Sequence, residues 1–181
     1  MINKYALLKV IKGIIRENNE FSLREVARKI GIGTSTAKET LDFLLMHDIL
    51  EKRIIGKTHL FRIKSNFLTK SIKVLYSLSE ISASKLVEEF ITKNPGISSI
   101  VLYGSVAKGE DDNKSDIDIL IISEKKAFIF DLKAERSLSR ELTILNYSYK
   151  DWKQKAEKDK VFYYNVISDC IPLYGEKPVV M

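Results

Sequence analysis

The chain has 181 residues, of which 45% are hydrophobic and 30% are charged, with a formal net charge of +6. This composition is ordinary for a globular protein, and the length predicts one or two domains. No apolar run reaches the roughly 18 residues of a membrane span, and the N-terminus lacks the apolar core of a signal peptide. A single cysteine excludes an intrachain disulfide framework, so we expect a cytoplasmic protein with no membrane partner.

The positive charge is concentrated in the first third of the chain. Residues 1–65 hold 13 Lys and Arg against 7 Asp and Glu, whereas residues 66–181 hold 17 of each. A basic module joined to a neutral one is typical of a protein whose first part faces nucleic acid. A diffuse basic surface is the alternative interpretation.

Amphipathic helices are predicted for the start of the chain. The first lies within residues 3–17, where apolar residues recur at helical spacing. The second begins at a capping box, in which Ser22 is followed three residues later by Glu25. A third helix begins near Thr34, after a glycine-rich turn. Its predicted buried side consists of Ala37, Leu41, Leu44 and Leu45.

A β-hairpin follows these helices. Strands are predicted at residues 49–55 and 58–64, separated only by Gly56-Lys57, and a glycine in the first turn position favours a type II′ turn. Three helices followed by a basic hairpin resemble the winged-helix form of the helix-turn-helix, seen in many prokaryotic transcription regulators. The resemblance covers residues 3–64 and implies a DNA-binding module.

Two surfaces of this module are candidates for DNA contact. The first turn of a recognition helix enters the major groove and its dipole favours phosphate, which predicts contacts from Ser35, Thr36 and Lys38. Basic side chains on the hairpin would neutralise backbone phosphates, giving affinity with little sequence choice. These are Arg53, Lys57 and Arg62, with Lys52 and Lys64 beside them. A winged helix that binds protein and leaves its basic face solvated is the alternative.

A connector separates this module from the rest of the chain. Residues 66–78 carry the apolar stripe of a helix, and residues 77–84 are small and polar, as in a hinge. We expect a winged helix at 1–65, a connector at 66–80 and a second domain at 81–181. The stripe could pack on either domain or form a dimer seam. Because helix-turn-helix proteins often bind DNA as two-fold dimers, a homodimer is one expectation.

The second domain is predicted to place a glycine-serine turn beside two carboxylates. Strands are predicted at residues 97–102 and 116–122, and Gly104-Ser105 closely follow the first strand. Side chains alternate along a strand, so Asp116 and Asp118 project from one face. Such a pair suits Mg²⁺, which binds a few carboxylates together with substrate phosphates. A solvated strand end is the alternative for an Asp-x-Asp sequence.

Two motifs here carry a family resemblance. They are Leu102-Tyr103-Gly104-Ser105-x-Ala107-x-Gly109 and Ser115-Asp116-Ile117-Asp118-Ile119-Leu120-Ile121. These motifs resemble the nucleotidyltransferase superfamily that includes DNA polymerase beta, and most closely its minimal prokaryotic members, with a weaker likeness over residues 80–181. The resemblance implies that Gly104 and Ser105 contact the phosphates of a nucleoside triphosphate and that Asp116 and Asp118 bind Mg²⁺.

The third metal carboxylate of that family is not evident in this chain. A strand predicted at residues 142–147 carries Thr143 at the matching position, where a hydroxyl cannot supply a carboxylate's charge. Glu141 lies two residues earlier on the same strand face, about 7 Å farther along at roughly 3.3 Å per residue. Because carboxylates clamp both the attacking and the leaving oxygen in two-metal phosphoryl transfer, we expect catalysis to suffer more than nucleotide binding. Glu141 is the candidate catalytic replacement.

Helices complete the predicted second domain. They span residues 83–92, 128–138 and 151–170, and the last has lysines interleaved with acidic residues, which indicates a solvated face. Cys170 is interpreted as a small buried hydrophobe because no base lies near it in sequence. His47 and His59 share no ligand spacing with each other or with the cysteine, so no zinc site is expected.

The sequence thus predicts an α+β protein with an N-terminal winged-helix domain and a C-terminal nucleotidyltransferase-type α/β domain with a small mixed sheet. Its expected activity is Mg²⁺-dependent transfer of a nucleoside monophosphate from a nucleoside triphosphate to a hydroxyl acceptor, on a protein or an RNA. DNA is the expected partner of the first domain. The alternative is a transcription regulator whose second domain is catalytically degenerate and only binds nucleotide or mediates assembly.

Overall fold

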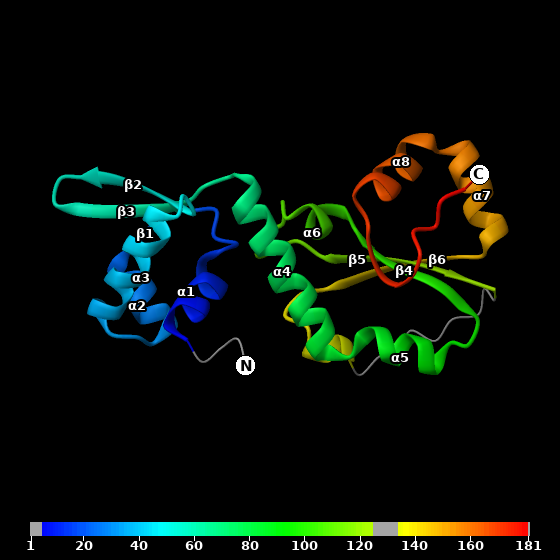
Figure 1. Cartoon of the computed structure of the whole chain (residues 1–181), viewed down its shortest axis with the longest axis horizontal. Coiled ribbons are helices and arrows are strands. Elements are labelled where there is room, and N and C mark those ends of the chain that lie inside the picture. Colours follow the sequence, from blue (N-terminus) through cyan, green and yellow to red (C-terminus); the bar gives the residue numbers. More distant parts are fainter. Residues whose placement is uncertain (1–4, 125–133, 181) are drawn as a thin grey trace. The chain divides into compact units, whose positions relative to one another are not determined.

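The computed structural model of the chain describes residues 5–124 and 134–180. The chain divides into two compact units, residues 1–73 and 74–181, which are described separately below (Figure 1). Helix α4, Phe67–Ser84, begins in the first unit and ends in the second. Within the two described ranges, no helix is long and apolar enough to cross a membrane.

The first unit has the winged-helix order of elements. These are α1 (Ala6–Ile14), β1 (Phe21–Ser22), α2 (Leu23–Ile30), α3 (Thr34–Met46), β2 (Leu50–Ile55) and β3 (Thr58–Ile63). The strands form an antiparallel sheet in the order β1-β3-β2, and the hairpin of β2 and β3 extends past the helices (Figure 1). Strand β1 was not predicted. It forms because Phe21 pairs with Phe61 of β3, and their stacked rings have centroids 6.4 Å apart.

Local chemistry fixes the helix and hairpin ends of this unit. The predicted capping box is present: the Glu25 amide donates to Ser22 Oγ at 3.3 Å, and the Ser22 amide donates to Glu25 Oε2 at 2.6 Å. Two amide groups that the start of α2 would leave unsatisfied are therefore bonded. In the hairpin turn, Gly56 has a φ of +60° and Lys57 has no positive φ, which fits the predicted type II′ turn.

The second unit consists of a mixed sheet with helices on its faces. Beyond the end of α4 it contains α5 (Leu86–Lys93), β4 (Ile97–Tyr103), α6 (Gly104–Lys108), β5 (Ile117–Ser123), a 3₁₀ turn (Ala134–Ser137), β6 (Leu142–Tyr147), α7 (Tyr149–Lys158), α8 (Lys160–Asp169) and β7 (Ile171–Gly175). The strand order is β6-β5-β4-β7. Strands β5 and β6 are parallel and the other neighbours are antiparallel, so the predicted small mixed sheet is confirmed.

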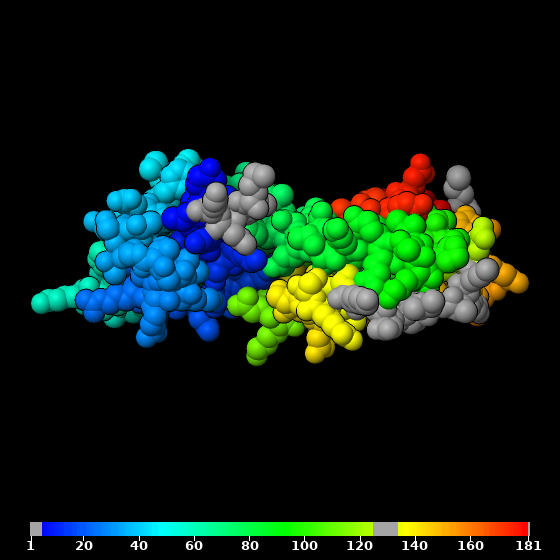
Figure 2. Space-filling view, turned by 90° about the horizontal axis from the view of Figure 1, so that it is seen from below, coloured from blue at the N-terminus to red at the C-terminus, as the bar shows by residue number. Residues whose placement is uncertain are grey.

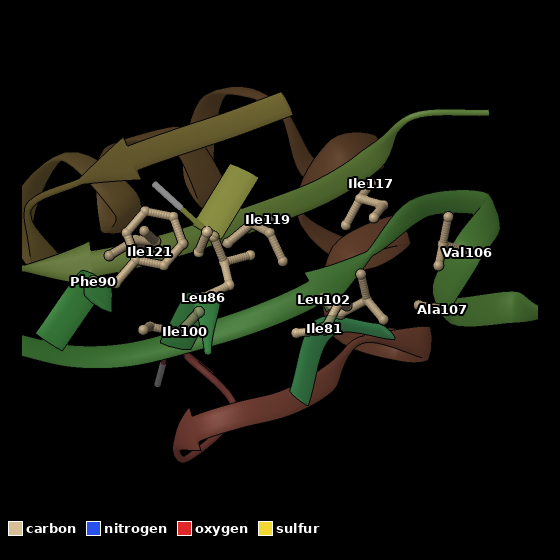
Figure 3. Close-up of a cluster of buried hydrophobic side chains, with 11 residues drawn as sticks. Ile81, Leu86, Phe90, Ile100, Leu102, Val106, Ala107, Ile117, Ile119 and Ile121 are labelled. Atoms are coloured by element: carbon tan, nitrogen blue, oxygen red, sulfur yellow. The ribbon is translucent and has the colours of Figure 1, made fainter. Parts of the chain in front are cut away.

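Alternation along β5 divides the core of this unit into two layers. Ile117, Ile119 and Ile121 face one layer; Leu86 and Phe90 of α5 lie beside Ile119 and Ile121, and Ile117 lies nearer Leu102 and Val106 (Figure 3). The other face carries Leu120 and Ile122, which pack with a second cluster drawn from α7 and α8: Trp152, Ala156, Tyr163 and Val166. Since side chains alternate along a strand, Asp118 belongs to the face that is covered by α7 and α8.

Two predicted elements differ from the structure, and a third lies mostly outside the described residues. Helix α4 runs without interruption through residues 77–84, where a hinge was expected, and the backbone instead turns at Lys85, which has a φ of +59°. The single helix predicted at 151–170 is two helices, because Asp159 leaves the helical region and its side chain accepts the Phe162 amide at 3.1 Å, capping α8. Most of the helix predicted at 128–138 lies outside the described residues, and Ala134–Ser137 is a 3₁₀ turn.

Candidate functional site

The two predicted metal ligands lie at the start of β5, in the middle of the sheet. Asp118 is the register partner of Tyr103 at the end of β4 and of Thr143 on β6. Asp116 directly precedes β5 and is exposed, whereas Asp118 is half-buried. Residues two apart on a strand share a face and are about 7 Å apart. Asp118 lies beside the turn that follows β4, and the charge of Asp116 acts on Asp118, so the two carboxylates are near each other.

Gly104 brings this turn into contact with Asp118. It has a φ of +74°, a region in which residues with a Cβ are strained. A Cβ built on Gly104 would lie 2.2 Å from Asp118 Oδ2 and 3.1 Å from its Cγ. Both the backbone conformation and the space at this position thus require glycine, and the close approach joins the predicted phosphate-binding turn to the predicted metal ligand. Ser105 follows in the first turn of α6 and is half-buried.

Electrostatic repulsion acts on the carboxylate pair. Burial raises the pKa of Asp118, and the negative charge of Asp116 raises it further. Burial and the charge of Asp118 raise the pKa of Tyr103 to about 12. A divalent cation bound by the two carboxylates would relieve the repulsion and stabilise the charged form of Asp118, which burial disfavours. The donor set therefore fits Mg²⁺, for which carboxylate oxygens are preferred ligands.

Among the residues that the structure describes, no third carboxylate completes the pair. Thr143 occupies the β6 position beside Asp118 and is exposed. Glu141 lies one residue before the strand, and its backbone carbonyl accepts the Ile117 amide at 2.9 Å. In residues 5–124 and 134–180, no group of three or more His, Cys, Asp or Glu is arranged to hold a metal ion. Glu141 is therefore near the pair in strand register without forming a three-carboxylate centre with it.

A polar cavity adjoins the carboxylate pair on its β6 side. Its volume is about 540 Å³, and both Asp116 and Glu141 line it. The remaining walls come from the loop before β5 and from the segment before β6: Asn113, Lys114, Ser115, Glu135, Leu138, Ser139 and Arg140. Asp118 is not among the residues that line this cavity, so the cavity meets the candidate site at Asp116 and Glu141.

Tyr103 is a site residue that the sequence indicated only as part of a motif. It is half-buried, pairs with Asp118 across the strands, and its ring contacts Phe162 of α8 edge-on with centroids 6.2 Å apart. Tyr103 thereby connects the carboxylate pair to the aromatic cluster under α7 and α8. The only signal for this in the sequence is its place directly before Gly104.

The predicted major-groove residues lie at the start of α3. Gly33 caps the helix, and no side chain bonds its first amides. Ser35 and Lys38 are exposed and Thr36 is half-buried, while Ser35 Oγ donates to Glu39 Oε1 at 3.5 Å. The buried side of the helix is Ala37, Thr40, Leu41 and Leu44. The helix therefore presents polar side chains and free amide groups at the end predicted to enter the groove.

The hairpin surface is basic but not purely so. Arg53, Lys57 and Arg62 are all exposed, and Arg62 pairs in register with Glu51. The Arg53 guanidinium forms an ion pair with Glu20 at 3.7 Å, an interaction that the sequence pattern did not indicate. Lys57 lies in the turn at the tip. The tip therefore offers the least compensated charge of the three predicted phosphate contacts.

Comparison with known proteins identifies the second unit. The family model described as "Polymerase beta, Nucleotidyltransferase" matches residues 85–178, which is more than half of the chain. The matched region includes β4, the Gly104 turn, both aspartates and β6. The chain therefore belongs to the polymerase beta nucleotidyltransferase family.

Two solved structures are similar to part of the chain. The match to the transcriptional repressor BigR from Xylella fastidiosa covers 40% of this chain and 82% of the BigR chain, at 28% sequence identity and a TM-score of 0.31. The match to reduced HlyU from Vibrio cholerae covers 42% of this chain and 87% of the HlyU chain, at 20% sequence identity and a TM-score of 0.31. No curated protein matches the chain.

Proposed function

We propose that the chain is a Mg²⁺-dependent nucleotidyltransferase whose winged-helix domain binds DNA. The observation that carries the proposal is the contact between the Gly104 turn and the Asp118 carboxylate, on which the charge of Asp116 acts. Membership of the polymerase beta nucleotidyltransferase family supports the same reaction class. Asp116 and Asp118 would hold Mg²⁺, which supplies positive charge against the phosphate oxygens.

Separate residues would bind the nucleotide and accept the proton of the attacking hydroxyl. Gly104 and Ser105 would hold the phosphates of the nucleotide through backbone and hydroxyl donors, and Asp116 and Asp118 would hold the cation beside them. The acceptor hydroxyl would attack the α-phosphorus from the cavity that Asp116 and Glu141 line. The new bond would join this oxygen to phosphorus, and the bond to the β-phosphate oxygen would break, which releases pyrophosphate. Glu141 would accept the hydroxyl proton.

A DNA-binding role for the first unit is supported by its element order and surface charge. The exposed polar start of α3 and the exposed Lys57 at the hairpin tip suit a groove contact and a phosphate contact respectively. Such a unit would bring the transferase domain to DNA. Its acceptor would then be a protein or an RNA found there.

A second candidate function is favoured by Thr143. With a hydroxyl beside Asp118 and no three-carboxylate centre among the described residues, the second unit would bind the Mg²⁺ nucleotide without transferring it. The chain would then be a DNA-binding regulator that senses nucleotide.

Transfer of radioactive label separates the two functions. The full chain would be incubated with ATP labelled at the α-phosphate and Mg²⁺, alone and with cell protein or RNA. Label that becomes covalently attached to any of these, and that is lost in the Asp116→Asn/Asp118→Asn variant, supports the transferase. Nucleotide binding without any label transfer supports the regulator. Glu157→Gln, which removes an exposed carboxylate of α7, is the matched control and should transfer label normally.

A further inference from the structure

A buried ion pair lies close to the carboxylate pair without being part of it. The Asp111 side chain is fully buried and that of Arg140 is 4% exposed. Arg140 Nη1 donates to Asp111 Oδ2 at 2.7 Å, and Nη2 donates to Ser77 Oγ at 3.2 Å. Glu80 Oε2 lies 3.8 Å from Nη2. One guanidinium thus joins α4, the loop before β5 and the segment before β6, all within the second unit.

Both partners are close in sequence to the proposed site residues. Asp111 lies in the loop that leads to Asp116, and Arg140 directly precedes Glu141. Arg140 also lines the cavity with Asp116 and Glu141. The ion pair therefore connects the backbone that carries Asp116 to the backbone that carries Glu141 and Thr143.

Hydrogen bonds within the loop carry this constraint from Asp111 to Asp116. Asp112 Oδ1 accepts the Lys114 amide at 2.9 Å and the Ser115 hydroxyl at 3.0 Å, while the Asp112 amide donates to Ser115 Oγ at 3.0 Å. These bonds restrain the loop between Asp111, which the ion pair anchors, and Asp116, the proposed metal ligand. A shift at Asp111 would consequently move Asp116.

Stability alone is a poor explanation for these charges. Two carboxylates and a guanidinium lose water when they are buried, and apolar side chains of similar volume commonly fold as well or better in such places. A planar guanidinium with several donors does, however, fix the relative position of the groups it bonds. The chemistry of the pair suits positioning more than stabilisation.

We propose that Arg140 and Asp111 are positioning residues that hold Asp116 in register with Asp118, so that both carboxylates face one cation. The inference rests on the proposed function and adds the side chains that pre-organise its metal site. Removal of residues that orient metal ligands without touching the metal typically lowers metal affinity by about 10- to 100-fold. We expect an effect of the same size on removal of Arg140 or Asp111.

The test compares the Mn²⁺ affinity of the wild type, a double variant and a control variant of the full chain, measured by electron paramagnetic resonance. The double variant Asp111→Leu/Arg140→Met replaces the pair by apolar groups. It should bind Mn²⁺ about 10- to 100-fold more weakly than wild type, while its thermal unfolding midpoint stays the same or rises. The matched control is Glu89→Gln/Lys93→Met, which removes another ion pair of the second unit, 2.8 Å long and on α5. The control should bind Mn²⁺ as the wild type does.

The outcomes separate the positioning role from the proposed function. Equal Mn²⁺ affinity in the wild type and in the folded double variant would overturn the positioning role alone. Failure of the wild type to bind Mn²⁺ would instead contradict the metal site on which the proposal rests. If the double variant does not fold, Arg140→Lys decides: it keeps the charge but cannot bond Asp111 and Ser77 through a planar fork. Weaker Mn²⁺ binding supports the proposal, and unchanged binding overturns it.

Discussion

Replacing Gly104 by alanine should damage the candidate site through two separable effects. The φ of +74° places the new side chain in the left-handed region, which costs about 1–2 kcal/mol for a residue with a Cβ. The new Cβ would also lie 2.2 Å from Asp118 Oδ2, where ordinary contact begins near 3.4 Å. The carboxylate must therefore move by about 1 Å, a displacement that can change a reaction rate by about 100-fold.

The expected result is a loss of both stability and ligand affinity. For a domain of about 100 residues, 1–2 kcal/mol lowers the unfolding midpoint by roughly 5–15 °C. Affinity for a fluorescent ATP analogue in the presence of Mg²⁺ should fall by about 10- to 100-fold, because the metal ligand is displaced. Titration by fluorescence and thermal unfolding by circular dichroism measure the two effects.

Gly31→Ala is the matched control for this variant. Gly31 has a φ of +71° and no atom within 4 Å of an added Cβ, so it reproduces the backbone strain without the contact. Its unfolding should change while its nucleotide affinity does not. If Gly104→Ala binds the ATP analogue as well as Gly31→Ala does, this turn does not position Asp118.

Three further predictions follow from the site and the hairpin. Thr143→Asp places a third carboxylate beside Asp118 and should raise label transfer about tenfold, or 1.4 kcal/mol; transfer that does not rise would contradict the proposed role of that position. Because the folded pKa of Asp118 is raised, its contribution to stability is present below the ordinary pKa of 3.8 and is lost as the pH rises through the folded value. Without metal, Asp118→Asn should therefore unfold at a higher temperature than wild type at pH 7, with the difference absent near pH 3; lower stability at pH 7 would oppose this. Lys57→Ala should reduce the slope of log affinity against log salt concentration for duplex DNA by about one, whereas Lys153→Ala on α7 should leave it unchanged.

Much of the fold follows from local sequence patterns. The capping box at Ser22 and Glu25, the turn glycine at 56 and the apolar runs of β4 and β5 each predict their element because the cause lies within a few residues. The position of Thr143 beside Asp118 also follows, since the predicted strand at 142–147 is the observed β6.

Other features depend on partners that are distant in sequence. Strand β1 has two residues and exists because Phe21 meets Phe61. Strand β7 contains Pro172, which argues against a strand except at a sheet edge, and the edge position beside β4 becomes evident only in the sheet order. The Arg140–Asp111 pair bridges 29 residues, and no local pattern distinguishes it from surface charge.

The candidate site also combines features that follow from local sequence with features that depend on distant contacts. The i, i+2 spacing of Asp116 and Asp118 predicts a shared strand face, but β5 begins at Ile117, so only Asp118 lies within the strand. The contact of Gly104 with Asp118 requires knowledge that β4 and β5 are antiparallel neighbours. Whether Glu141 acts in catalysis stays a prediction, because its backbone register is known but its reach depends on the bound substrate.

The proposed function depends on Asp116 and Asp118 together holding the cation of a bound nucleotide. Calorimetric titration of MgATP into the full chain and into Asp116→Asn/Asp118→Asn tests it most directly, with Glu157→Gln as the control for loss of surface charge. We expect the wild type and the control to bind MgATP, with binding that disappears in EDTA, and the double variant to bind at least tenfold more weakly. Equal binding by all three proteins, or binding that survives EDTA unchanged, would contradict it.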